Sequence, residues 1–429
     1  MRMTGLNFES IPPLATPFRF YLTAPIFALI AAALLIDQGS AIWLSRWMPA
    51  SLAITHLLAL GVMGLIMVGS LFQVVPVLCG APLKIEKWSL LLMHGGLMIG
   101  TLALSAAFLG WTTFLTGFAL LALSLGYFVI RLVLVLVRQA QGEQTRLPIF
   151  LAATALGGGV VIGLLLISNV LWGWLPTFGK SITNLHAGFG VFGWVLLLVM
   201  AVSFQVIPMF HVTPTFPAPW RIGLISMTLF GLFSLSMVTL LELDQYYAGV
   251  ICPMVAVVYA LMGIERLSKR KRKLPDAVVT YWLVGWSCLI LGCVLIIAMP
   301  LIGDQYQAKA EVFVGLIIGL GFILGIIQGM LLKIVPFLIT LHLQRLAMQN
   351  PAGMMLLPDH YQLISRNQGK YQFRLYLLVL MSIFGALFMP SLTPLLGVCI
   401  ASNWLVIAYN ISKATYVYRQ VHKQMLASE

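Results

Sequence analysis

Long apolar runs recur along the whole chain, and each is close to the length that crosses a lipid bilayer as a helix. Such a helix needs about 20 mostly apolar residues, because the hydrocarbon layer is roughly 30 Å thick. Polar and charged positions gather in the short connections between the runs. The pattern predicts twelve membrane-spanning helices, at residues 19–36, 50–79, 88–109, 111–137, 147–172, 182–209, 221–240, 246–264, 278–299, 311–340, 374–390 and 393–412.

An internal repeat accompanies these runs. The second, sixth and tenth runs contain GVMGLIMVGSLFQVVPVL (61–78), GWVLLLVMAVSFQVIPMF (193–210) and GFILGIIQGMLLKIVPFL (321–338). Because equivalent runs are four apart, we expect three four-helix arcs of one orientation with pseudo-threefold symmetry, at about 19–137, 147–264 and 278–412. The ungapped alignment matches Gly61 with Gly193 and Gly321, Gln73 with Gln205 and Lys333, and Pro76 with Pro208 and Pro336.

The three aligned polar residues, Gln73, Gln205 and Lys333, allow two interpretations. A proline within a helix frees a backbone carbonyl, and a polar side chain three residues earlier can satisfy it, while the lysine can extend its ammonium to the inner interface. On that interpretation Lys333→Gln is tolerated. Alternatively, the three side chains form an inner polar cluster that lines a vestibule.

Composition indicates that the chain lies in a membrane, and the distribution of charge indicates its orientation there. The chain is 61% hydrophobic and 9% charged, whereas soluble domains are about 45–50% apolar and about 25% charged. With the N-terminus inside, 22 of the 25 lysines and arginines fall on the inner side, and only Arg46, Lys180 and Lys309 fall outside. The positive-inside rule then predicts two cytoplasmic termini in a bacterial inner membrane. The basic run RLSKRKRK (266–273) is a stop signal beside anionic lipid on this interpretation, and nucleic acid is not an expected partner.

The connections are too short for a soluble domain, so residues 1–429 are expected to form a single transmembrane domain. The longest connection, 341–373, is predicted as a cytoplasmic loop with an interfacial amphipathic piece followed by a polar turn. Residues 1–18 are polar and contain proline, which does not indicate a cleavable signal peptide.

Two of the seven histidines lie in the outer half of the predicted membrane. His56 in THLLALG and His186 in NLHAGFG are both near the outer start of a repeat run. Ionisable side chains inside a span are costly and tend to face a bundle interior or a cavity, so two at matching depth favour a site. The structural alternative is that His56 hydrogen-bonds across helices, with Thr55, Asn184 or Glu311 as outer-side neighbours.

On these features the sequence resembles the haem-copper oxidase subunit I superfamily, in which twelve spans form three four-helix arcs. The resemblance covers the whole chain in span number, topology and repeat. It implies that His56 matches the low-spin haem ligand on span two and that His186 matches the copper ligand on span six. The oxidase-like NnrS family, implicated in haem and copper binding and nitric-oxide stress, has a similar plan and is the closer comparison.

Departures from the oxidase pattern limit this expectation. His186 is followed by Ala187 and Gly188 instead of Pro and Glu, span seven lacks a histidine pair, and span ten has no histidine. An oxygen-reducing centre therefore lacks its usual ligands, and whether the protein is an enzyme stays open.

Two histidines can still hold a cofactor. Each could be the single axial ligand of a five-coordinate haem, of the b type because no CxxCH motif is present. His56, Met63 and Met67, at offsets of seven and eleven, would share one face of a regular helix and suit Cu(I). Gly190 and Gly193 would leave room for a flat macrocycle beside His186.

The leading hypothesis is a haem- or copper-binding membrane protein, related to subunit I but not a turnover oxidase, in nitric-oxide or respiratory stress, electron transfer or cofactor handling. Two alternatives are a transporter or channel without cofactor and a non-catalytic assembly partner of a respiratory complex. Expected partners are the lipid bilayer, with respiratory subunits or further copies of the chain left open. No Walker motif or dinucleotide fingerprint indicates a soluble-type enzyme.

Overall fold

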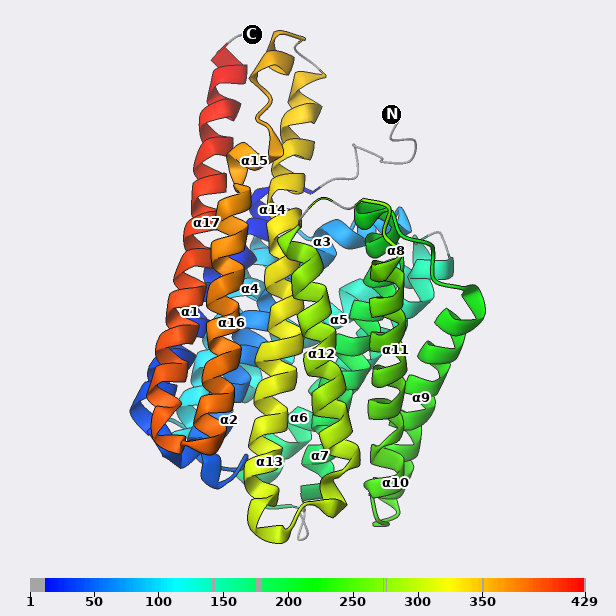
Figure 1. Cartoon of the computed structure of the whole chain (residues 1–429), viewed down its shortest axis with the longest axis vertical. Helices are drawn as coiled ribbons and strands as arrows, with labels where there is room; N and C mark the ends of the chain where they lie inside the picture. Colours follow the sequence, from blue (N-terminus) through cyan, green and yellow to red (C-terminus); the bar gives the residue numbers. More distant parts are fainter. Residues whose placement is uncertain are drawn as a thin grey trace. The chain divides into compact units, whose positions relative to one another are not determined.

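The structure is a computed structural model that describes residues 12–140, 143–174, 180–272, 274, 276–348 and 351–427. It is 87% helical, and the described residues contain no strand. Twelve helices in this part of the chain are long and apolar enough to cross a membrane, which confirms an all-α polytopic protein with twelve spans. Figure 1 shows the helices as ribbons coloured along the chain.

Of the twelve spans in the described residues, six are one helix and six join two or three segments. In chain order the spans are α1 (Ala15–Gln38) with η2 (Gly39–Leu44); α2 (Pro49–His56), η3 (Leu57–Gly64) and α3 (Leu65–Cys79); α4 (Lys87–Phe108); α5 (Phe114–Arg138); α6 (Glu143–Trp172); α7 (Lys180–Gly188), η4 (Phe189–Leu196) and α8 (Leu197–His211); α9 (Ala218–Leu240); α10 (Tyr246–Gly249) and α11 (Ile251–Ser268); α12 (Ala277–Ile297); α13 (Asp304–Leu316), η6 (Ile317–Ile323) and α14 (Leu324–Ala347); α16 (Arg366–Phe388); and η8 (Pro390–Leu392) with α17 (Thr393–Ala427). Shorter 3-10 or α segments are η5 (Met299–Leu301), η7 (Pro351–Leu356) and α15 (His360–Leu363).

The connection predicted at 341–373 is shorter in the structure. Span ten continues to Ala347 and α16 begins at Arg366, so residues 348–365 separate the two helices. A capping box starts α16, because Ser365 Oγ accepts from the Gln368 amide at 3.2 Å and Gln368 Oε1 accepts from the Ser365 amide at 3.0 Å. Hydropathy marks only the apolar part of a span, and the polar turns at its ends keep their helical hydrogen bonds.

The three repeat spans each contain a π-helical segment at the same place. The segments η3, η4 and η6 begin at Leu57, Phe189 and Ile317, in each case four residues before the aligned glycine of the sequence repeat. Single π turns inside α-helices are uncommon and are frequent at functional sites. The sequence repeat therefore has a counterpart in the local geometry of the backbone.

The repeat spans are also the most buried ones. In the most apolar window of spans two, six and ten, 67% of the residues are buried, compared with 28–50% in the other nine spans. A helix that is buried on most of its surface is surrounded by other helices, whereas a less buried one leaves more of its surface for lipid. The three repeat spans therefore have more of their surface covered by other parts of the protein than the remaining spans do.

The helices pack in two compact units. The first contains the described parts of 1–73, 275–285 and 316–429. In it α1 and α17 lie antiparallel, since Gly397 near the start of α17 contacts the Ala32 carbonyl and Ile36 near the end of α1. The indole nitrogen of Trp43 donates to Thr393 Oγ1 at 2.9 Å at the same end. Figure 1 shows α14, α16 and α17 side by side, and all three are in contact.

The second unit contains the described parts of 74–274 and 286–315. Its neighbours along the chain pack in pairs, α4 with α5, α5 with α6, and α9 with α11. Glycines allow close approach in two of these pairs. A Cβ on Gly117 would lie 3.0 Å from the Leu104 amide nitrogen, and one on Gly231 would lie 2.7 Å from Cys252 Sγ. In the same unit α8 also contacts α11.

Candidate functional site

His56 is the last residue of α2 and immediately precedes the π segment η3. Its Nδ1 lies 2.8 Å from the Leu52 carbonyl oxygen, and the side chain is half-buried. A carbonyl can only accept a hydrogen bond, so Nδ1 carries the proton and Nε2 keeps the lone pair of the neutral ring. This bond is within the same helix, whereas a cross-helix bond was the structural alternative for this residue.

A hydrogen bond to a neighbouring helix holds the ring of His186. Its Nδ1 lies 3.0 Å from the carbonyl oxygen of Gly159 on α6, which again makes Nε2 the lone-pair nitrogen. The ring packs on Gly163, because a Cβ at that position would be 2.9 Å from His186 Cε1. The backbone of α6 thus sets both the tautomer and the plane of the imidazole.

The two histidines share this arrangement although they belong to different units. A histidine that ligates a metal usually donates its other ring N–H to a carbonyl or carboxylate, which orients the ring and raises its basicity. Both rings meet this condition with a backbone carbonyl. His56 lies in the first unit and His186 in the second.

The glycines proposed to make room beside His186 differ from one another. A Cβ on Gly190 meets nothing within 4 Å, whereas one on Gly193 would lie 2.8 Å from Ala155 Cβ and 3.1 Å from Leu232 Cδ1. Gly190, one turn after His186, therefore leaves open space, and Gly193 serves close helix packing instead. The expectation of room at Gly193 is wrong because α6 fills it.

The methionines proposed as copper ligands lie in and after the π segment. Met63 is half-buried within η3, and Met67 is 7% exposed on α3. A π-helix turns through a smaller angle per residue than an α-helix, so the offsets of seven and eleven no longer place both on the face of His56. Among the described residues, no group of three or more His, Cys, Asp or Glu side chains could hold a metal ion.

The aligned polar residues make two equivalent contacts. Gln205 Nε2 donates to Thr145 Oγ1 at 2.8 Å, and Lys333 Nζ pairs with Asp276 Oδ2 at 2.8 Å. In both repeats, the partner is at the start of the preceding span. Gln73 is 5% exposed, and its Nε2 has no hydrogen-bond partner within the described part of the chain.

A buried amide network in the first unit was not predicted from the sequence. Gln372 on α16 donates to the Gln328 carbonyl at 3.3 Å, and its Oε1 accepts from Asn410 on α17 at 3.0 Å. Asn403 donates to the Gln372 carbonyl at 3.2 Å. These side chains are at most 3% exposed, so the network joins α14, α16 and α17 inside the protein. The available signal was the spacing of Asn403 and Asn410, seven residues apart on one face of an apolar helix.

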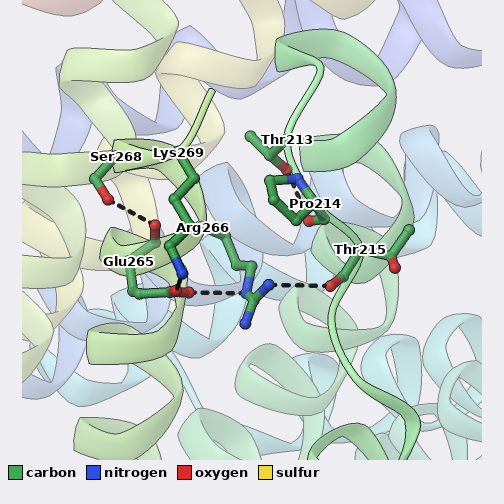
Figure 2. Close-up of polar contacts among 7 residues, drawn as sticks. All are labelled: Thr213, Pro214, Thr215, Glu265, Arg266, Ser268 and Lys269. Atoms are coloured by element: carbon green, nitrogen blue, oxygen red, sulfur yellow. Dashed lines mark hydrogen bonds and ion pairs between the residues drawn. The ribbon is translucent and has the colours of Figure 1, made fainter. Parts of the chain in front are cut away.

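The basic run that begins at Arg266 is hydrogen-bonded to the connection between α8 and α9 (Figure 2). Arg266 Nη1 donates to the Thr215 carbonyl at 3.4 Å, and its Nε lies 2.8 Å from Glu265 Oε2. Lys269 also pairs with Glu265, one turn earlier on α11. The start of the run therefore fixes the α8–α9 connection against α11 in the second unit.

No protein-family model matches the chain, and no curated protein is significantly similar to it.

Proposed function

We propose that this protein binds b-type haem through His56 and His186, each as a single axial ligand, and that it is not an oxygen-reducing oxidase. One observation carries the proposal. Both imidazoles are held through Nδ1–H by a backbone carbonyl, at 2.8 Å for His56 and 3.0 Å for His186, so Nε2 would be the coordinating nitrogen of each ring.

The residues around the histidines fit a haem better than a copper ion. Open space at Gly190 beside His186 suits a flat macrocycle. A copper site needs further soft or imidazole ligands on the same face, and the π geometry removes the regular-helix argument for Met63 and Met67. When bound, a haem would supply one-electron redox chemistry and a coordination position for a diatomic ligand. Nitric-oxide response, electron transfer and cofactor handling are the roles that follow.

We further propose three four-helix arcs with pseudo-threefold symmetry, in which spans two, six and ten are equivalent. Three observations support this arrangement: the π segments in register, the equal burial of the three spans, and the matching contacts Gln205–Thr145 and Lys333–Asp276. The contact between α1 and α17 also brings the first and last spans together, as a closed ring of arcs requires.

The proposed setting is a bacterial inner membrane with both termini in the cytoplasm. The distribution of lysine and arginine supports this orientation, and the antiparallel packing of α1 and α17 is compatible with it.

The test is spectroscopy of the full chain produced with ample haem and copper and purified through a tag free of histidine. The unmutated protein is expected to show a Soret band and the pyridine haemochrome of haem b. His56→Ala and His186→Ala should each remove about half of the haem, and the double variant nearly all of it, because each ring holds one haem. His360→Ala, in the connection between α14 and α16, is the matched control and should keep the full content.

Equal unfolding midpoints for the variants and the parent would show that a loss of haem is not a loss of fold. A parent protein with neither haem nor copper overturns the cofactor proposal and favours a transporter or an assembly partner. If the parent protein contains copper and no haem, and only His56→Ala and His186→Ala lose that copper, then copper and not haem is the cofactor bound by these residues.

A further inference from the structure

A pocket lies where α4 begins and α5 ends, on the side that the proposed orientation makes cytoplasmic. Its lining residues come from the connection before α4, from the first turn of α4, and from one face of α5; they are Lys84, Ile85, Glu86, Ser89, Tyr127 and Arg131. All six belong to the second unit. The pocket is lined on two sides by cationic side chains, Lys84 from the connection and Arg131 from α5.

The guanidinium of Arg131 is held in place by the pocket wall. Its Nη2 donates to the Lys84 carbonyl at 2.9 Å, and its Cζ lies 5.9 Å from the centre of the Tyr127 ring one turn earlier. A guanidinium has five N–H donors, so the bond to Lys84 leaves donors for a ligand. With its remaining donors, the Arg131 guanidinium can donate two parallel hydrogen bonds to a phosphate.

The charges in the pocket indicate the class of ligand. Lys84 and Arg131 contribute two positive charges and Glu86 one negative charge, so the lining carries a single net positive charge. A phosphodiester carries one negative charge, which this lining balances. Ser89 and Tyr127 add hydroxyl groups, which can donate to its oxygens. The carboxylate of Glu86 disfavours a ligand with two negative charges, such as free phosphate or a phosphomonoester.

The surfaces beside the pocket are apolar. Trp88 and Leu92 on α4 are 72% and 74% exposed, and Ile130 on α5 is 59% exposed. Tryptophan is enriched at the membrane–water interface, where its ring lies at the level of the headgroups. An occupant with acyl chains would therefore find its hydrocarbon next to exposed apolar side chains and its headgroup next to the two cations.

We propose that this pocket binds the phosphodiester headgroup of an anionic phospholipid in the inner leaflet. Basic pockets between membrane helices on the cytoplasmic side are known to hold such headgroups. The proposal does not depend on haem, because the lining residues take no part in the proposed haem sites.

The test is native mass spectrometry of the delipidated full chain, titrated in separate arms with phosphatidylglycerol, phosphatidylcholine and inorganic phosphate. The parent should bind phosphatidylglycerol in preference to the other two. Lys84→Gln and Arg131→Gln should each weaken that binding about fivefold, because a basic residue near an anionic headgroup contributes about 1 kcal/mol. Glu86→Gln should strengthen it.

Arg138→Gln is the matched control, since Arg138 ends the same helix outside the pocket and the change removes the same charge. Its binding of phosphatidylglycerol should stay within about twofold of the parent. An equal loss in Arg138→Gln and Arg131→Gln would overturn the site, since binding would then follow net charge alone. Competition by inorganic phosphate at the same concentration would assign the pocket to a free anion and overturn the lipid proposal.

Discussion

A histidine inside a membrane span can bind a ligand only on the side toward which its ring is oriented. His56 takes its direction from its own helix through the Leu52 carbonyl, whereas His186 takes it from α6 through the Gly159 carbonyl. The orientation of His186 therefore depends on how closely α6 and α7 approach. Gly163 permits that approach because it has no side chain.

We predict that Gly163→Ala displaces the His186 ring and weakens the packing of α6. The added Cβ would be 2.9 Å from His186 Cε1, closer than real contacts allow, so the ring has to move. Overpacking of this kind costs about 1–3 kcal/mol, and the haem content should fall with it. Thermal unfolding in detergent and the Soret absorbance measure the two effects. Gly126→Ala on α5, where a Cβ meets nothing within 4 Å, should change neither.

A second prediction at this scale concerns the ion pair of Lys333 and Asp276. The two side chains are 15% and 21% exposed, so the pair lies between an exposed pair and a buried one. We expect Asp276→Asn to cost about 1–3 kcal/mol, between the values for those two extremes. Asparagine keeps the side-chain oxygen that accepts from the Val278 amide at 3.0 Å, so the change isolates the charge.

The matched double variant, Asp276→Asn with Lys333→Gln, makes the contact neutral, like Gln205 with Thr145 in the preceding repeat. Its unfolding free energy should exceed the value expected from adding the two single changes. Strict additivity would show that the charges do not interact. The single variant Lys333→Gln tests the sequence-based expectation that this change is tolerated.

At the scale of elements, the π segments set which side chains of the repeat spans meet the preceding span. Gly61 in η3 faces α1, where an added Cβ would be 2.2 Å from Phe27 Cδ1, and Gly193 in η4 faces Ala155 on α6. The aligned glycines are therefore packing positions in at least two repeats. Gly321, the third, has its carbonyl bonded to the Tyr376 hydroxyl at 2.5 Å.

From this packing we predict that Gly61→Ala and Gly193→Ala each destabilise the protein by about 1–3 kcal/mol, because α1 and α6 would have to move away. Gly190→Ala, in the same π segment as Gly193 but facing open space, should leave the unfolding midpoint unchanged. Chemical unfolding of the three variants in one detergent compares them directly. Equal losses at Gly190 and Gly193 would mean that the change acts through helix geometry and not through contact with α6.

The spans were predictable from the sequence because burial in a bilayer demands long apolar runs, whatever their neighbours are. The π segments were not, since no residue type in Leu57–Gly64 distinguishes a π turn from an α turn. The shared face expected for His56, Met63 and Met67 presupposed a regular helix. The partner of Lys333 required knowledge of which helices touch. The histidines were singled out by their depth, but the carbonyls that orient them depend on the folded backbone.

At the scale of the whole molecule, the packing units do not follow the sequence repeats. The first unit joins the two ends of the chain through α1 and α17, and its boundaries fall inside spans two, nine and ten. Within the first unit, spans two and ten touch through η3 and η6, so this unit brings together elements of the first and third sequence repeats.

The last prediction concerns the orientation of the whole chain. Since α1 and α17 lie antiparallel, the start of α1 and the end of α17 are on the same side, and one reporter decides the side of both. We expect a fluorescent-protein fusion at Glu429 to be bright and an alkaline phosphatase fusion there to be inactive, because 22 of the 25 lysines and arginines would then be cytoplasmic. A fusion after Leu243, in the connection between spans seven and eight, should give the opposite pair of signals. Phosphatase activity at Glu429 together with fluorescence at Leu243 would show that the chain has the opposite orientation. His56 and His186 would then lie on the cytoplasmic side, and the pocket at Arg131 would no longer face the inner leaflet.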